Sequence, residues 1–478
     1  MEQDLKKQTA RSILWNALDK VGFQMVALGV GLITMRLLSP REFGLIGALA
    51  IFTALSNILV ESGFSSAMIR RKENSDGEYV AVLSFNVALS LLFYILLFLF
   101  SPSIANYCKM PELETLSHLL FLSVVFNSLG IVPIIQLTKS LSFKKMSIAS
   151  LMGALVSGIV TILLILKGYS YWALAWQIVL QSAVKTTLLW LFCGWLPNCA
   201  PRFEVLKELF SFSFSLIGTN LLNTLARYVY NPYIGRYFGE ERLGYYAESY
   251  KFYILPVNII SGTFAGVALP VLSKLNEEPS RQLTYLRKMM RVVAFAIFPV
   301  MMGAMACFDN LEMVILGAKW TEIVPYFRVL AVAGLVGPMH VMYLNLMVVK
   351  GFTKCNLLLE VVRNVLTILF LFLFHDSVYM ILWGIVAANL LSYVVDLFFV
   401  RRVVAYSIFN QLKDIFPYII LSLFMGGCVY LVGTLSLEVH LKLLLQLLVG
   451  GVTYLLPAKI LGSTVLEDVL NAFLKKGN

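Results

Sequence analysis

The sequence predicts an all-α membrane protein made of many transmembrane helices, and three observations support this fold class. Of the 478 residues, 59% are hydrophobic and only 14% are charged, which is more apolar surface than a soluble domain of this size can bury. Apolar stretches of about 20 residues recur along the whole chain, and each can cross a bilayer as a helix. A short motif also occurs twice, at residues 36–44 and 236–244, which indicates an internal repeat.

About fourteen such apolar stretches follow one another along the chain. The first comes after the polar start MEQDLKKQTAR, is too long for the core of a signal peptide and lacks a small-residue cleavage site, so we expect it to be retained. The loops between the stretches are short, which leaves no room for a soluble catalytic domain. The predicted transmembrane spans are residues 14–36, 43–64, 80–101, 117–138, 146–167, 171–192, 210–235, 244–271, 292–311, 323–349, 356–374, 378–400, 415–435 and 441–461.

The repeated motif reads RLLSPREFG at residues 36–44 and RYFGEERLG at residues 236–244. The two copies are six predicted spans apart, an even number, so both enter the membrane in the same direction. Parallel repeats of this kind are typical of transporters, whose substrate lies between the two halves. We therefore predict a six-helix lobe at residues 1–200, a second six-helix lobe at 201–405, and two additional transmembrane helices with an amphipathic C-terminal tail at 406–478.

The net charge of +11 is distributed unevenly over the loops. Lysines and arginines gather in alternate loops, for example at residues 70–72 and 139–145, and are sparse in the loops between. Because basic residues accumulate on the cytoplasmic side of membrane proteins, both termini are predicted to be cytoplasmic. The basic face is expected to contact anionic lipids of the inner leaflet, which explains the charge without a nucleic-acid partner.

Cysteine and histidine provide no sign of a metal centre or a redox site. The six cysteines and four histidines are scattered, and no pair has the spacing of a zinc site or a redox motif. We therefore predict no metal and no cofactor.

Ionisable residues inside the predicted spans are the best candidates for function. A charge at the centre of a membrane helix costs about 2.5 to 3.5 kcal/mol on insertion scales, so each should face protein or a water-filled cavity. Polar residues follow them at intervals of three or four, which places them on one helix face. The clearest stripes are Thr53, Asn57 and Glu61 in the second span, Gln177, Gln181 and Lys185 in the sixth, and Asn220, Asn223, Thr224, Arg227 and Asn231 in the seventh.

The charges suggest an anionic substrate. Lys20, Lys185 and Arg227 have no acidic neighbour suitably placed on their own helix, and unpaired cations in a membrane cavity suit a ligand that carries phosphate. Lys251 and Arg363 each have a glutamate three residues before them, Glu248 and Glu360. Neutralisation by that glutamate is an equal alternative to substrate binding at these two positions. The predicted substrate-binding residues are Lys20, Lys185, Arg227, Lys251 and Arg363, and the predicted ion-coupling residues, which would take up H⁺ or Na⁺, are Asp19, Glu61 and Asp396.

Several stretches together resemble the polysaccharide-transporter family of the multidrug/oligosaccharidyl-lipid/polysaccharide exporter superfamily, in its Wzx-like, colanic-acid-exporter branch. They are RLLSPREFG, SGFSSAMIRRKE at residues 62–73, PIIQLTKSLSFKKM at 133–146 and GYSYWALAWQ at 168–177. The resemblance implies a V-shaped bundle of fourteen helices whose central cavity opens alternately to either side. Cations of that cavity would hold the substrate's diphosphate and sugar acids, and Lys20, Lys185, Arg227 and Lys251 are the matching candidates by position.

The same resemblance implies a flippase of the bacterial inner membrane. Its substrate would be an undecaprenyl-diphosphate-linked oligosaccharide, moved from the cytoplasmic to the periplasmic leaflet for lipopolysaccharide, capsule or exopolysaccharide biosynthesis. An ion gradient or the membrane potential would drive the transport. The protein is expected to act as a monomer, beside the polysaccharide biosynthesis machinery.

Two other functions compete with this interpretation. A cation-coupled multidrug exporter of the same superfamily would need acidic and aromatic groups in its cavity, and the surplus of cations argues against it. A membrane glycan polymerase or ligase would need a sizeable outward loop with paired catalytic groups, which the sequence lacks. The sequence therefore predicts a transporter without catalytic residues.

Overall fold

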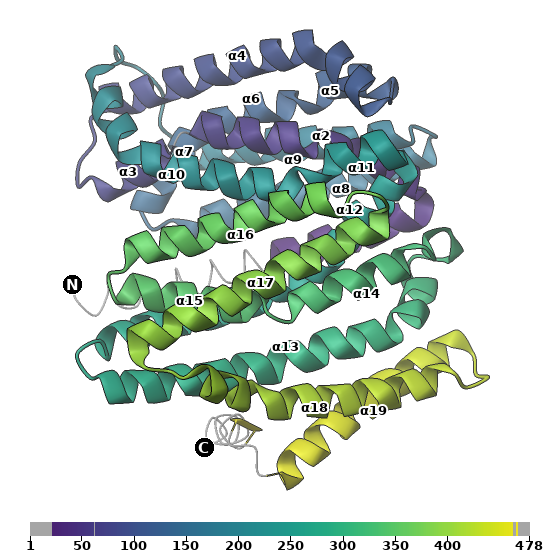
Figure 1. Ribbon diagram of the computed structural model, residues 1–478. Coiled ribbons are helices and arrows are strands. Elements are labelled where there is room, and N and C mark those ends of the chain that lie inside the picture. Colours follow the sequence, from purple (N-terminus) through teal and green to yellow (C-terminus); the bar gives the residue numbers. More distant parts are fainter. Residues whose placement is uncertain (1–21, 62, 462–464, 467–478) are drawn as a thin grey trace. The chain divides into compact units, whose positions relative to one another are not determined.

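The structure is a computed structural model that describes residues 22–61, 63–461 and 465–466 (Figure 1). All the regular elements within these ranges are helices, which confirms the all-α fold class. The chain divides into two compact units, residues 1–244 and residues 245–478. The lobe boundaries expected at residues 200 and 405 stay predictions, and most of the expected C-terminal tail lies outside the described residues.

Unit 1 contains the helix Gly22–Leu37 and ten labelled helices, and α12 begins at its end. These are α2 (Pro40–Glu61), α3 (Phe64–Arg70), α4 (Asp76–Cys108), α5 (Glu112–Leu120), α6 (Leu122–Leu129), α7 (Ile131–Lys139), α8 (Phe143–Leu166), α9 (Tyr171–Cys193), α10 (Glu204–Tyr228), α11 (Tyr230–Phe238) and α12 (Glu240–Lys274).

Unit 2 continues α12 and contains the remaining helices. These are α13 (Pro279–Ile315), the short 3₁₀ helix η1 (Ala318–Trp320), α14 (Ile323–Gly334), α15 (Gly337–Val349), α16 (Thr353–Leu373), α17 (Val378–Val404), α18 (Ile408–Gly433) and α19 (Val439–Ile460).

The predicted spans coincide with helices. Within the described ranges, eleven helical stretches are long and apolar enough to cross a membrane. The other three predicted spans overlap the helix Gly22–Leu37, which is apolar but shorter, α9, and α10 with α11. The total of fourteen transmembrane helices stays a prediction.

The first copy of the repeated motif forms the start of α2. The backbone N–H of Ser39 donates to Glu42 Oε2 at 2.9 Å, which is one half of a capping box, and Pro40 occupies the first helical position, as is common at a helix N-terminus. The second copy ends α11 and starts α12, with Gly239 at φ 88° between them. Both copies therefore mark the point where one helix ends and the next begins.

The two copies pack directly against each other within unit 1. A Cβ atom added to Gly44 would lie 1.7 Å from the carbonyl oxygen of Glu240, and one added to Gly244 would lie 1.8 Å from the carbonyl oxygen of Pro40. Each glycine thus contacts the first residue of the other copy's helix, so the contact is reciprocal. Arg41 spans the same crossing, since its Nε donates to Glu240 Oε1 at 2.9 Å. The internal repeat is therefore a structural pair as well as a sequence pattern.

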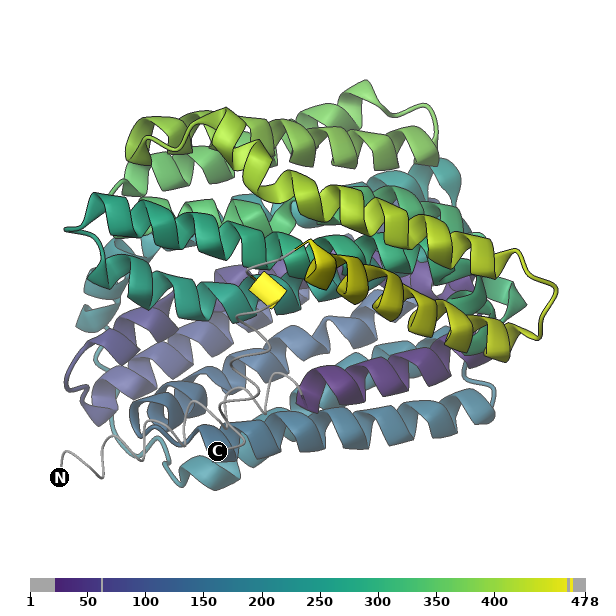
Figure 2. The ribbon, with the colours of Figure 1, turned by 90° about the horizontal axis from the view of Figure 1, so that it is seen from below.

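Unit 2 is held together along α13, α18 and α19. Figure 2 shows α18 and α19 side by side and joined by one turn. The Tyr454 hydroxyl on α19 donates to the carbonyl oxygen of Phe295 on α13 at 2.9 Å. On α13, Asn310 donates to Gln446 Oε1 of α19 at 2.9 Å, so polar bonds as well as apolar packing fix these three helices.

Candidate functional site

A cavity of about 230 Å³ lies inside unit 1, between α2, the α6–α7 pair and α9. Apolar side chains form one part of its wall, and hydroxyl, amide and charged groups form the rest. The lining residues are Asn57, Val60, Glu61, Asn127, Ser128, Gly130, Ile131, Ile134, Lys185, Thr186 and Leu189.

Two of the predicted site residues line this cavity together. Glu61 is the last residue of α2, and Lys185 lies on α9. Their opposite charges attract each other, although the sequence separates them by more than a hundred positions. The polar faces predicted for the second and sixth spans therefore meet at one place, and the ammonium group of Lys185 has a carboxylate nearby.

Neutral polar groups surround this charged pair. Asn127 Nδ2 on α6 donates to Asn57 Oδ1 on α2 at 3.1 Å, and the hydroxyls of Ser128 and Ser90 are 2.8 Å apart. Amide and hydroxyl groups beside an ammonium can together surround an anionic oxygen. The arrangement can bind a phosphate or carboxylate group by charge and by hydrogen bonds.

The break between α6 and α7 positions Lys185. Pro133 has no N–H, so the carbonyl of Leu129, four residues earlier, has no helical donor. Trp190 Nε1 of α9 donates to that carbonyl at 2.9 Å, and Thr186 Oγ1 donates to the carbonyl of Phe126 at 2.8 Å. These bonds fix the position of α9 along the broken span, and Lys185 directly precedes Thr186.

Close helix packing on the other side of α9 supports the same position. A Cβ atom added to Gly153 of α8 would lie 3.1 Å from the carbonyl oxygen of Gln181 and 3.3 Å from Lys185 Cβ. An alanine here would require α8 and α9 to separate by a few tenths of an ångström. The base of the Lys185 side chain is thus held between α8 and the α6–α7 break.

The hydrogen bond from Thr186 allows a direct test of this positioning. We expect Thr186→Val to lower the free energy of unfolding by about 1 kcal/mol, because the Phe126 carbonyl loses its donor inside the membrane. The control is Thr187→Val on the same helix, whose exposed hydroxyl bonds only to the carbonyl of Ala183 in its own helix. Thermal unfolding of the purified protein in detergent measures both; equal shifts would contradict the role given to Thr186.

The other predicted residues have different surroundings. Arg227 on α10 is exposed and has no ion-pair partner among the residues that the structure describes. Lys20 and Asp19 lie outside the described residues. The substrate-binding role of Lys20 and Arg227 and the ion-coupling role of Asp19 stay predictions.

Two predicted cations pair with carboxylates on their own helices. Lys251 Nζ lies 2.5 Å from Glu248 Oε1, and Arg363 lies 3.6 Å from Glu360 Oε2. Local neutralisation, the alternative that the sequence left open, is therefore the arrangement in the structure.

The remaining predicted carboxylate, Asp396, has a partner that sequence reasoning missed. Its side chain is fully buried, and its Oδ2 lies 2.6 Å from Nδ1 of His340. His340 is on α15 and Asp396 is on α17, 56 residues later. Asn127, Ser128 and Thr186, which also line the cavity, do not belong to any of the polar stripes seen in the sequence.

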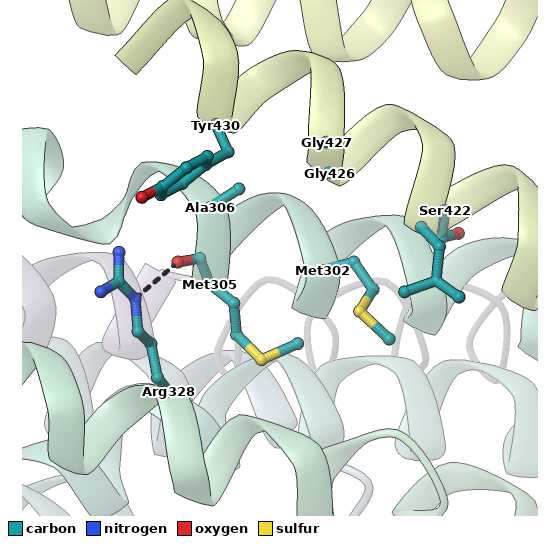
Figure 3. Close-up of a pocket in the computed structure, with 9 residues that line it drawn as sticks. Met302, Met305, Ala306, Arg328, Ser422, Gly426, Gly427 and Tyr430 are labelled. Atoms are coloured by element: carbon teal, nitrogen blue, oxygen red, sulfur yellow. Dashed lines mark hydrogen bonds between the residues drawn. The ribbon is translucent and has the colours of Figure 1, made fainter. Parts of the chain in front are cut away.

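Unit 2 contains a larger, mainly apolar groove of about 450 Å³ between α13 and α18 (Figure 3). Methionines 302 and 305, glycines 426 and 427, and Tyr430 line most of it. Its one guanidinium is already engaged, because Arg328 Nε donates to the carbonyl of Met305 at 3.0 Å and the same side chain pairs with Asp309. The cavity of unit 1 is therefore the better site for a charged ligand.

Comparison with known proteins adds independent information. Residues 33–325 match the family described as "Polysaccharide biosynthesis protein". The succinoglycan biosynthesis transport protein ExoT of Rhizobium meliloti is 23% identical over 68% of this chain and 66% of that protein. The lipopolysaccharide biosynthesis protein WzxC of Escherichia coli is 25% identical over 69% of this chain and 68% of that protein. The matched part thus spans about two thirds of each relative's length.

A solved structure also shares the fold. The lipid II flippase MurJ, in an inward closed conformation, superposes with a TM-score of 0.77 at 14% identity. The match covers 93% of this chain and 98% of that one. At this level of identity the likeness concerns the fold alone.

Proposed function

Because the chain belongs to the polysaccharide biosynthesis protein family, we propose that it transports a lipid-linked oligosaccharide across the membrane in which it is embedded. The membership confirms the resemblance seen in the sequence, and the apolar helices make the chain a multi-pass membrane protein. The proposed substrate is an oligosaccharide on a polyprenyl diphosphate carrier. It would be flipped from the cytoplasmic to the periplasmic leaflet of a bacterial inner membrane, with both protein termini in the cytoplasm.

The observation that supports this function most directly is Lys185 in the cavity of unit 1. An ammonium inside a membrane bundle is unfavourable unless an anion or a set of dipoles balances it. Here Glu61 attracts Lys185, and the amides of Asn57 and Asn127 line the same cavity. A diphosphate group carries more negative charge and more acceptor oxygens than the Glu61 carboxylate. It could therefore replace Glu61 as the main partner of Lys185.

Glu61 then becomes a natural candidate for coupling. When an anionic ligand occupies Lys185, a second negative charge in the same small cavity is unfavourable, so Glu61 would take up a cation or a proton. Binding of the anionic ligand at Lys185 and binding of the cation or proton at Glu61 would thus be coupled within one cavity. Asp19 and Asp396 remain the other proposed ion-coupling residues, and Lys20 and Arg227 the other proposed cations of the substrate path.

The multidrug-exporter alternative gains no support from this cavity. Its lining residues in the described part of the chain include no aromatic side chain, and its single carboxylate faces a lysine. Organic cations bind best to aromatic faces and unpaired carboxylates. The cavity therefore favours an anionic ligand.

Removal of the lysine charge tests the proposal. The variant is expressed in cells whose own gene for this protein has been deleted. We expect Lys185→Gln to lower the amount of surface glycan at least about tenfold, because the substrate would lose one charge-assisted hydrogen bond. Lys185→Arg should retain a large part of the export, because it keeps the charge. Surface glycan is measured on intact cells with a glycan-specific antibody or lectin, and the amount of protein in the membrane is measured alongside.

The matched control is Lys167→Gln. Lys167 is an exposed lysine at the end of α8, outside the cavity, and its substitution should leave export unchanged. Wild-type glycan levels in Lys185→Gln, at normal protein abundance, would rule out the proposed role of the cavity.

A further inference from the structure

A second polar centre lies in unit 2. His340 Nδ1 and Asp396 Oδ2 are 2.6 Å apart, and their side chains are 5% and 0% exposed. The outer atoms of the pair, His340 Nε2 and Asp396 Oδ1, are buried without a hydrogen-bond partner in the described residues. A histidine and an aspartate enclosed in this way, with no second partner among the described residues, need an explanation beyond packing.

The charges around the pair leave Asp396 unbalanced unless the pair holds a proton. On α16, Glu360 and Arg363 face Asp396 and compensate each other at 3.6 Å. Further away, Asp414 of α18 is neutralised by Arg287 and Arg291 of α13, and Arg328 of α14 pairs with Asp309. The other titratable groups around the pair are the phenols of Tyr343, Tyr393 and Tyr406, which are neutral at ordinary pH.

Among the described residues, His340 is the titratable group that is hydrogen-bonded to Asp396 and can balance its charge directly, while Arg363 is already paired with Glu360. With a neutral imidazole, the pair is a buried carboxylate with a net charge of −1, which the apolar surroundings strongly disfavour. With one proton added, as imidazolium and carboxylate or as imidazole and carboxylic acid, the net charge is zero. Binding and release of a single proton from water thus switch the centre between neutral and negative.

The chemistry of the ligands favours a proton over a metal ion. Hard cations such as sodium need several oxygen ligands, but one oxygen of Asp396 is occupied by the imidazole of His340. No group of three potential metal ligands occurs in the part of the chain that the structure describes. A histidine paired with a carboxylate is instead a common proton carrier at physiological pH.

We propose that the His340–Asp396 pair is a proton-binding site that couples substrate transport to a proton gradient. This inference rests on the proposed transport function, and it assigns the driving ion and the residues that carry it. The pair is linked to the start of α18, because Tyr343, one turn after His340, donates to Gln411 Oε1 at 2.9 Å and stacks on Tyr393, one turn before Asp396. A change of charge on the pair therefore acts on α15, α17 and α18 together.

Proton binding is measured first on the purified full-length chain, without any substrate. The protein in detergent is titrated in weakly buffered solution from about pH 9 to about pH 5.5, across the range in which a histidine titrates, with a pH indicator. We expect Asp396→Asn and His340→Gln each to take up about one proton fewer than the wild type. Each variant removes one of the two groups that share the proton.

Two controls accompany the titration: a variant of an exposed aspartate, and a change of the salt. Asp376→Asn removes an exposed aspartate that also lies beside a histidine, and its proton uptake should equal that of the wild type. Equal uptake by the wild type and both variants of the buried pair would overturn the proposal. So would a difference that disappears when sodium chloride replaces choline chloride, because sodium would then occupy the site. If one variant of the pair does not fold, the other provides the same comparison.

Transport is measured second, as surface glycan in cells before and after the pH gradient is collapsed with nigericin. Export by the wild type should fall, whereas export by Asp396→Asn should already be low and should not respond. Lys185→Gln should lose export, but adding Asp396→Asn to it should still lower its proton uptake by about one proton, which separates the two sites. If the wild type exports no glycan, the proposed function fails, and the titration still decides whether the pair binds a proton. Export by the wild type that does not depend on the gradient would overturn the coupling.

Discussion

Gly44→Ala should disrupt the protein more than any other single-methyl change in the part of the chain described here. The added Cβ would lie 1.7 Å from the carbonyl oxygen of Glu240, and this oxygen belongs to the backbone of α12 and cannot rotate away. The starts of α2 and α12 must move apart by more than an ångström to accept it. We expect a loss of more than about 3 kcal/mol in the free energy of unfolding, above the usual cost of overpacking. Thermal unfolding in detergent and protein abundance in the membrane both report it.

The reciprocal contact makes a second, independent variant available. Gly244→Ala places its Cβ 1.8 Å from the carbonyl oxygen of Pro40, so its effect should be of the same size. The control is Gly262→Ala, on the same helix α12, where a Cβ meets nothing within 4 Å. That change should be neutral or stabilise the helix by up to about 1 kcal/mol. Similar stability of all three variants would mean that the two copies of the motif do not pack against each other.

Asp414→Asn should cause the second large loss of stability. The Asp414 carboxylate accepts two hydrogen bonds from Arg287, at 2.7 and 3.0 Å, and one from the Tyr406 hydroxyl at 2.6 Å, and Arg291 lies 3.3 Å away. Breaking a buried ion pair costs about 3 to 5 kcal/mol. Both arginines are about one third exposed and can reach water. We therefore expect Asp414→Asn to lower the free energy of unfolding by about 2 kcal/mol, which is less than for a fully buried pair.

This loss should show as a lower unfolding temperature of the purified protein, with α13 and α18 separating first. Asp376→Asn is the control, because that carboxylate is exposed and should contribute no more than about 0.5 kcal/mol. If Asp414→Asn unfolds at the wild-type temperature, the cluster at the start of α18 does not stabilise unit 2.

Local patterns in the sequence predicted some features of the site well and others poorly. The stripe that ends at Glu61 and the stripe that ends at Lys185 each follow helical spacing, so their faces could be assigned without a structure. Their meeting in one cavity could not, because residues on different helices are joined by packing. The predicted span 117–138 gave a similar mixed result. It is apolar throughout, but the structure divides it at Phe121 and at Gly130, and the second break exposes the carbonyls that position α9.

The ion pairs also show that the sequence predicts contacts within one helix but not contacts between helices. Glu248 with Lys251, and Glu360 with Arg363, are three residues apart, so helical geometry alone suggested these pairs. His340 and Asp396 show no such relation, because His340 was an isolated histidine in the sequence and Asp396 was assigned to a polar face of a different span. Only the packing of α15 against α17 brings them within hydrogen-bond distance.

The sequence by itself determined the fold class, the positions of the helices, the repeat and the family, because hydropathy and motif order are properties of neighbouring residues. It also identified which charges lie within the predicted spans. The tertiary structure alone decided which of those charges share a site: Glu61 with Lys185, and His340 with Asp396. It likewise decided that the two copies of the motif touch through Gly44 and Gly244. Contacts of this kind depend on how closely helix surfaces approach, which no local pattern encodes.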